Sequence, residues 1–124
     1  MKLTINKWTS VGSIQCAFSS FFPAFKLEFY LCKRSQESVY PDNEKLKSEY
    51  IVSSNNKSIL GCTIEINSTD KVRDIERMFY EKYGLCAQIF FKCRNRWMQT
   101  VKSDHYSLKR LEWELGFSRN FILL

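Results

Sequence analysis

The chain has 124 residues, 44% of them hydrophobic and 15% aromatic, and a formal net charge of +6. This content of apolar side chains is enough to build a core, which excludes a largely disordered chain. No run approaches the roughly 18 apolar residues of a membrane span. The start of the sequence also lacks the long apolar stretch of a signal peptide, so we expect a cytoplasmic protein without a membrane segment.

A repeat organises the sequence. Residues 3–23 align with residues 64–84 at a constant offset of 61. After one residue of slippage, residues 25–31 align with residues 85–91. Five pairs in the first alignment are identical and lie mainly at apolar positions: Ile5/Ile66, Asn6/Asn67, Val11/Val72, Ile14/Ile75 and Phe18/Phe79. The repeat predicts two units of similar structure, residues 1–60 and 61–124.

Each copy begins with the pattern of a strand, a helix and a second strand. Leu3 and Ile5 alternate with polar residues, as in a half-buried strand. Apolar residues in segments 11–22 and 72–83 recur at i, i+3, i+7 and i+11, which predicts two equivalent amphipathic helices. The alternation then returns and predicts strands over 25–31 and 85–91.

Polar residues at the start of the two helical segments suggest how each helix begins. Thr9 or Ser10 is expected to cap the first helix, and Asp70 the second. Asp74 and Glu76 place negative charge near the start of the second helix, where the helix dipole favours it. We interpret these carboxylates as helix-stabilising rather than as catalytic groups or metal ligands.

The remaining segments predict shorter elements. In chain order we expect a turn at 41–43, a short element over 44–50, one long strand over 58–67, a strand over 96–101, a short helix over 107–115 and a closing strand over 120–124. We expect the large aromatic residues outside the helical stripes to have structural roles in the core or between the units: Trp8, Phe21, Phe22, Phe25 and Trp113.

Residues 63–124 resemble a ubiquitin-type β-grasp module. The strand "TIEIN", the helix "STDKVRDIERMFYEKYGL", the hairpin "QIFFKCRNRWM" and the ending "SLKRLEWELGFSRNFILL" follow in the order and spacing of that family. The chain also resembles small uncharacterised bacterial proteins with two such units. The resemblance implies an α+β fold with two tandem β-grasp (ubiquitin-like) units, each with a mixed sheet packed on one helix. The first unit lacks a clear initial hairpin.

The resemblance also bears on function and assembly. The sequence ends at Leu124 without Gly-Gly, so we do not expect conjugation as a ubiquitin-like modifier. A unit of about 60 residues is marginally stable alone, so we expect the units to pack together or to pair with another chain as a homo-oligomer.

The outward face of the predicted sheet is the candidate partner-binding surface. Tyr30 and Phe90 occupy equivalent outward positions in the two copies. Near Phe90, the segment 92–97 adds an aromatic residue and three cations, and aromatic and Arg side chains are frequent anchors in protein interfaces. The candidate residues are Tyr30, Phe90, Lys92, Arg94, Arg96 and Trp97. A packing role between the two units remains the alternative for the aromatic residues.

These features lead to two hypotheses. The first is a non-enzymatic protein-interaction module that acts through the exposed sheet face of a ubiquitin-like fold. The alternative is a nucleic-acid-binding protein, in which the basic aromatic turn around residues 90–97 holds phosphates and stacks on bases. A solvated polar turn would explain the same cations.

Cysteine and histidine usage gives little support to an enzyme. The five cysteines are Cys16, Cys32, Cys62, Cys86 and Cys93, and their spacing contains no CxxC motif. We interpret them as free thiols in a reducing compartment. The single histidine, His105, is expected in a surface loop. We therefore predict no catalytic residues, no cofactor and no metal site. A small enzyme or redox protein is the least favoured hypothesis.

Overall fold

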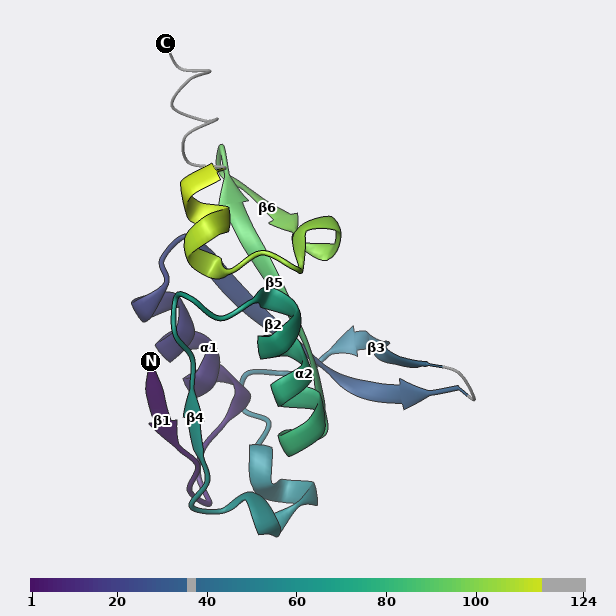
Figure 1. Cartoon of the computed structure of the whole chain (residues 1–124). Helices are drawn as coiled ribbons and strands as arrows, with labels where there is room; N and C mark the ends of the chain where they lie inside the picture. Colours follow the sequence, from purple (N-terminus) through teal and green to yellow (C-terminus); the bar gives the residue numbers. More distant parts are fainter. Residues whose placement is uncertain (36–37, 115–124) are drawn as a thin grey trace.

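The computed structural model describes residues 1–35 and 38–114 (Figure 1). Within this range the main elements are β1 (Lys2–Thr4), α1 (Val11–Phe21), β2 (Phe25–Arg34), β3 (Val39–Lys45), β4 (Thr63–Glu65), α2 (Val72–Tyr83), β5 (Leu85–Cys93) and β6 (Arg96–Gln99). Three short 3₁₀ helices, η1 (Val52–Asn55), η2 (Lys57–Ile59) and η3 (Val101–Ser103), lie in the connections. Residues 108–114 are also helical. The expectation of an α+β fold is confirmed.

The strands form two antiparallel sheets, and each sheet combines strands from both halves of the sequence. β1 pairs with β4, and the larger sheet has the order β3-β2-β5-β6 (Figure 1). The expectation of a separate mixed sheet in each unit is therefore wrong for the described residues. One half alone would offer its helix a two-stranded hairpin, which is marginally stable in water, whereas joining the halves gives four strands. The predicted strand at 120–124 lies outside the described residues.

The two ladders that join the halves are both centred on equivalent residues of the repeat. Leu3 pairs with Ile64, its equivalent 61 positions later. Glu28 pairs with Gln88, its equivalent after the one-residue slip. A residue that lies opposite its own equivalent in an antiparallel ladder lies on a two-fold axis. A local two-fold axis through these two pairs therefore relates the halves.

The expected helices over 11–22 and 72–83 are confirmed, but they begin differently. Ser10 caps α1, because its side chain accepts from the backbone N–H of Ser13 while the Ser13 hydroxyl accepts from that of Ser10. At α2 the cap residue is Lys71, without a side-chain hydrogen bond. The expectation that Asp70 caps α2 is wrong. Its Oδ2 instead accepts from the backbone N–H of Asn67 at 2.8 Å.

Main-chain carbonyl groups explain why α2 forms without a side-chain cap. In both helices the first two N–H groups donate to the loop that follows an edge strand: Val11 to Tyr50, Gly12 to Ser48, Val72 to Tyr106 and Arg73 to Asp104. These bonds satisfy donors that a helix leaves unpaired at its start. The approach is close at Gly12, where an added Cβ would lie 2.9 Å from the Ser48 carbonyl oxygen.

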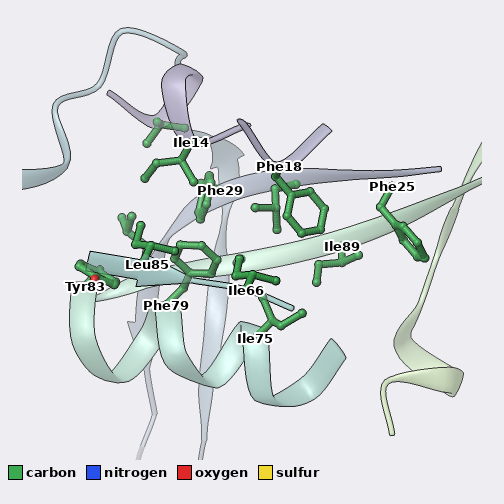
Figure 2. Close-up of a cluster of buried hydrophobic side chains, with 14 of the residues drawn as sticks. Ile14, Phe18, Phe25, Phe29, Ile66, Ile75, Phe79, Tyr83, Leu85 and Ile89 are labelled. Atoms are coloured by element: carbon green, nitrogen blue, oxygen red, sulfur yellow. The ribbon is translucent and has the colours of Figure 1, made fainter. Parts of the chain in front are cut away.

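The core lies between the larger sheet, the two helices and the β1–β4 pair. Figure 2 shows side chains from α1, α2 and the strands converging on one cluster, in which Phe79 meets Phe29 edge-on with ring centroids 4.9 Å apart. The apolar stripes of both helices are buried as expected: Val11, Ile14 and Phe18 in α1, and Val72, Ile75, Phe79 and Tyr83 in α2. Each large apolar side chain that is fully buried contributes roughly 1.5–3 kcal/mol.

Two expectations about the first half are wrong. Residues 41–43 lie inside β3 instead of in a turn, and Pro41 pairs with Cys32. A proline is tolerated here because β3 is an edge strand, where a missing N–H breaks no ladder on the outer side. The long strand expected over 58–67 is reduced to β4, preceded by η2 and by Gly61 in a left-handed conformation with φ 85°.

Several aromatic residues expected to pack inside are instead on the surface. Trp8 and Trp113 are each 73% exposed and Phe21 is 63% exposed, while Phe25 is buried as expected. In the helical segment 108–114 the buried residues are Leu108 and Leu111. At 100° per residue, Trp113 lies on the opposite side of the helix from Leu111, so it cannot anchor this helix to the core.

Candidate functional site

Five of the six sequence-predicted site residues lie on one hairpin. Phe90 and Lys92 are on β5, Arg96 and Trp97 are on β6, and Arg94 is in the turn between the strands. The turn is tight because Arg94 and Asn95 both adopt left-handed backbone conformations, with φ 51° and 65°. This is the geometry of a two-residue turn that matches the twist of the flanking strands.

Lys26 joins two of these residues into a compact group. It lies opposite Phe90 in the β2–β5 ladder, and its Nζ is 5.2 Å from the Phe90 ring centroid and 5.0 Å from that of Trp97. Lys92 lies opposite Trp97 in the β5–β6 ladder, with its Nζ 6.0 Å from the ring centroid. We call these four residues the aromatic–lysine cluster. Each cation–π contact at an exposed site contributes about 0.5–1 kcal/mol.

Sequence reasoning missed Lys26 as a site residue. Strand alternation places its side chain on the same outward face as Tyr30, four residues later. The contact with Phe90, however, depends on the register between β2 and β5, which are far apart in the sequence. The position of Lys26 opposite Phe90 would have been predictable only with the local two-fold axis through Glu28 and Gln88.

Tyr30 shares the outward face but is not brought into this cluster. It pairs with Cys86, four residues from Phe90 along β5, or roughly 13 Å at the rise of a strand. Glu28 lies between the two ends of the face. Its Oε1 is 3.5 Å from the Nζ of Lys26 and 3.8 Å from that of Lys45.

Exposed apolar residues also lie along the edge strand β6, but only Trp97 belongs to the outward face. Met98 lies opposite the buried Phe91, so its side chain points to the other side of the sheet, and Val101 follows β6 in η3. Trp97 is 40% exposed, Met98 52% and Val101 63%. Arg94 and Arg96 are exposed beside them and make no ion pair within the described part of the chain. Arg96 lies opposite Cys93, which packs against the core, so its side chain is also on the other side of the sheet from Trp97. The outward face at this end therefore has the two rings at its centre and Lys26 and Lys92 as its basic rim.

A second feature is a groove of about 390 Å³ along β5 and α2. β6 pairs only with residues 90–93 of β5, so the preceding part of β5 has no strand on that side. Side chains bind the main chain of Ile89 instead. The N–H of Ile89 donates to Glu76 Oε2 at 3.2 Å, and its carbonyl accepts from Thr100 Oγ1 at 2.7 Å. Arg73 also lines the groove.

Glu76 has an altered acidity in this groove. The pKa of its carboxyl is raised from 4.5 to about 7, mainly by burial and to a smaller extent by the nearby Asp104, while the hydrogen bond from the N–H of Ile89 acts in the opposite direction. Its charge was expected to complement the dipole of α2. The structure shows that its carboxylate instead binds the edge of β5. The matching position in the first copy is Gln15, so the repeat alignment contained a polar pair that could have signalled this site.

The remaining candidates for catalysis or metal binding are the histidine and the acidic and cysteine side chains. His105 is exposed, as expected, with its Nδ1 4.0 Å from Asp104 Oδ1 and its ring 4.3 Å from that of Tyr106. No group of three or more histidine, cysteine or acidic residues in the described ranges could hold a metal ion.

Comparison with other proteins does not extend this description. Among the described residues, no helix has both the length and the apolar character needed to cross a bilayer. No protein-family model matches the chain, and neither the curated proteins nor the solved structures include a match. Any function must therefore be inferred from the surface itself.

Proposed function

We propose that this chain is a non-enzymatic protein-interaction module that binds a partner through the outward face of its larger sheet. The observation that carries this proposal is the aromatic–lysine cluster. Lys26 holds Phe90 and Trp97 together on a face where the side chains of residues 26–32 of β2 and 86–92 of β5 that point outward are at least partly exposed. Ordered aromatic groups with a basic rim provide anchors for a protein surface, and the rim favours acidic residues in the partner.

The contacts of the rings favour a protein over a nucleic acid. Base stacking requires an open aromatic face. Lys26 and Lys92 both lie over the Trp97 ring, and Lys26 also lies over Phe90. The exposed part of Trp97 on the edge strand β6 suits packing against apolar side chains of a partner.

We also propose that residues 1–60 and 61–124 are tandem copies of one ubiquitin-like β-grasp unit that fold together. Support comes from the common order of strand, helix and two strands, and from the ladders centred on equivalent residues. Free cysteines are typical of a reducing compartment, so we place the interaction in the cytoplasm.

A pull-down from the native host with quantitative mass spectrometry tests the interaction. We expect Trp97→Ala to reduce recovery of the partner roughly tenfold or more, as for a central aromatic anchor. Trp8→Ala is the matched control, because Trp8 is an exposed tryptophan with Lys7 Nζ 5.2 Å from its ring. This control should retain the partner.

The outcome depends on both variants remaining folded, which the thermal unfolding midpoint verifies. Unchanged recovery with folded Trp97→Ala, or an equal loss with Trp8→Ala, would contradict the proposed surface. Crosslinking of the captured complex would show whether the partner is another protein or a second copy of this chain.

Nucleic-acid binding remains the second candidate because Lys92, Arg94 and Arg96 are all exposed along one turn. Binding of labelled single-stranded RNA or DNA should then weaken with salt, with a logarithmic slope of about −2 for three phosphate contacts. A triple change of these cations to Gln should remove that slope. No binding of either probe at low salt would eliminate this candidate.

A further inference from the structure

Two cysteines from different halves meet on the outward sheet face. Cys32 is on β2 and Cys86 is on β5, and their Sγ atoms are 2.7 Å apart. Cys86 lies opposite Tyr30, so Cys32 is its diagonal neighbour, and an irregularity in the β2–β3 pairing lies between Tyr30 and Cys32. The contact thus joins residues 54 positions apart across the central ladder of the molecule.

The distance is close to that of a covalent bond. A disulfide has an S–S length of about 2.05 Å, so the sulfurs need to move together by well under 1 Å. Cys16, Cys62 and Cys93 make no comparable sulfur–sulfur contact within the described residues.

We propose that Cys32 and Cys86 are a redox-active thiol pair, which a hydroperoxide oxidises to a cross-strand disulfide and a small thiol reduces again. This proposal is independent of the proposed protein partner. Both thiols are only half-buried, so a small peroxide can reach the pair from solvent. The disulfide would covalently connect the two halves at the end of the sheet opposite the aromatic–lysine cluster.

The reaction balances in two steps. With hydrogen peroxide, the sulfur of Cys32 attacks one oxygen and the O–O bond breaks. The departing hydroxide takes up the thiol proton of Cys32 and leaves as the first water, and Cys32 becomes a sulfenic acid. The sulfur of Cys86 then attacks the sulfur of Cys32 and its thiol proton leaves with the hydroxyl group as the second water. The peroxide takes up two electrons, which come from the two thiols.

The environments of the two thiols support this order. Burial raises the pKa of Cys86 to about 12, and its contact with Cys32 adds to the effect. Cys86 is therefore protonated near neutral pH and is the poorer initial nucleophile. The first attack then falls to Cys32, and the nearby Cys86 resolves the sulfenic acid.

Peroxide treatment of the full-length, fully reduced chain tests the proposal. We expect one equivalent of hydrogen peroxide to remove two titratable thiols and about 2 Da of mass, with both restored by dithiothreitol. Non-reducing peptide mapping of the wild-type chain should recover the peptide that links Cys32 to Cys86. Oxidation should also raise the thermal unfolding midpoint, because the bond closes a long loop.

Variants distinguish this pair from general thiol oxidation. Cys32→Ser and Cys86→Ser should each abolish the linked peptide and the rise in midpoint, whereas Cys16→Ser and Cys62→Ser should retain both. A different linkage, or thiol loss without any linkage, would overturn the proposal. Peptide mapping of the wild type decides the matter even if a serine variant fails to fold.

Discussion

The two ends of the outward sheet face are related by the local two-fold axis, yet their side chains differ chemically. Positions Lys26 and Lys92 at one end correspond to Cys86 and Cys32 at the other. The lysines contact aromatic rings, while the cysteines contact each other. Both functional proposals therefore lie at positions where equivalent backbone carries non-equivalent side chains.

The two strand edges that no neighbouring strand covers, one on β2 before Tyr30 and one on β5 before Phe90, also carry different side-chain partners. In the first half, the Phe29 carbonyl accepts from the backbone N–H of Leu46, and Gln15 Nε2 donates to the Leu27 carbonyl. In the second half, the side chains of Glu76 and Thr100 bind the main chain of Ile89 beside the groove. The two halves therefore share their core residues and backbone arrangement. They differ in the side chains at the strand edges and on the outward face, which is where both candidate sites lie.

The largest effect should come from removing equivalent anchors of the core. Phe18 and Phe79 are both fully buried, so Phe18→Ala and Phe79→Ala should each lower the free energy of unfolding by about 3–5 kcal/mol. Because both sheets are shared between the halves, each variant should still unfold in one transition. Urea unfolding followed by circular dichroism and by tryptophan fluorescence would measure both properties.

The same experiment tests whether the halves are energetically independent. Two separate transitions, with only one shifted by each substitution, would mean that units 1–60 and 61–124 unfold separately. Leu46→Ala is a milder control, since Leu46 is only partly buried at the margin of the core. It should shift the same single transition by a smaller amount.

The sequence predicted the helices well because their apolar stripes depend on local spacing, and α1 and α2 lie where that spacing places them. It failed for strand pairing because β2 and β5 have the same alternation, which does not specify a partner. The turn predicted at Pro41 is wrong, because a proline is tolerated in β3 only through an edge position that the assembled sheet defines. The contact of Lys26 with two rings depends on the same long-range register.

A pH-dependent effect should distinguish the two strand edges. Folding raises the pKa of Glu76 from 4.5 to about 7, so the folded state retains this proton more strongly than the unfolded state. The contribution to stability is fully present below pH 4.5 and is lost as the pH rises through 7. The expected loss is about 3 kcal/mol, from a pKa difference of about 2.5.

Glu76→Gln should remove this dependence while its amide oxygen still accepts from Ile89. The variant should match the wild type near pH 4.5 and exceed it by up to about 3 kcal/mol at pH 8. The reciprocal change, Gln15→Glu, removes the donor to the Leu27 carbonyl and should destabilise the chain by about 1–3 kcal/mol at pH 8. Parallel pH profiles for wild type and Glu76→Gln in urea unfolding would refute this assignment.

The smallest expected effect concerns the tight turn, which is short only in the second half. β5 ends at Cys93 and β6 begins at Arg96, whereas β2 ends at Arg34 and β3 begins only at Val39. Asn95 has φ 65°, a conformation that glycine adopts without strain from a Cβ, so Asn95→Gly should stabilise the chain by about 0.5–1 kcal/mol. Thermal unfolding would detect the gain as a rise of a few degrees in the unfolding midpoint.

Asn95→Val provides the opposite control, since a β-branched residue is disfavoured at positive φ and should lower the midpoint. If both substitutions lowered it equally, the side chain of Asn95 rather than its backbone conformation would stabilise the hairpin that carries Trp97.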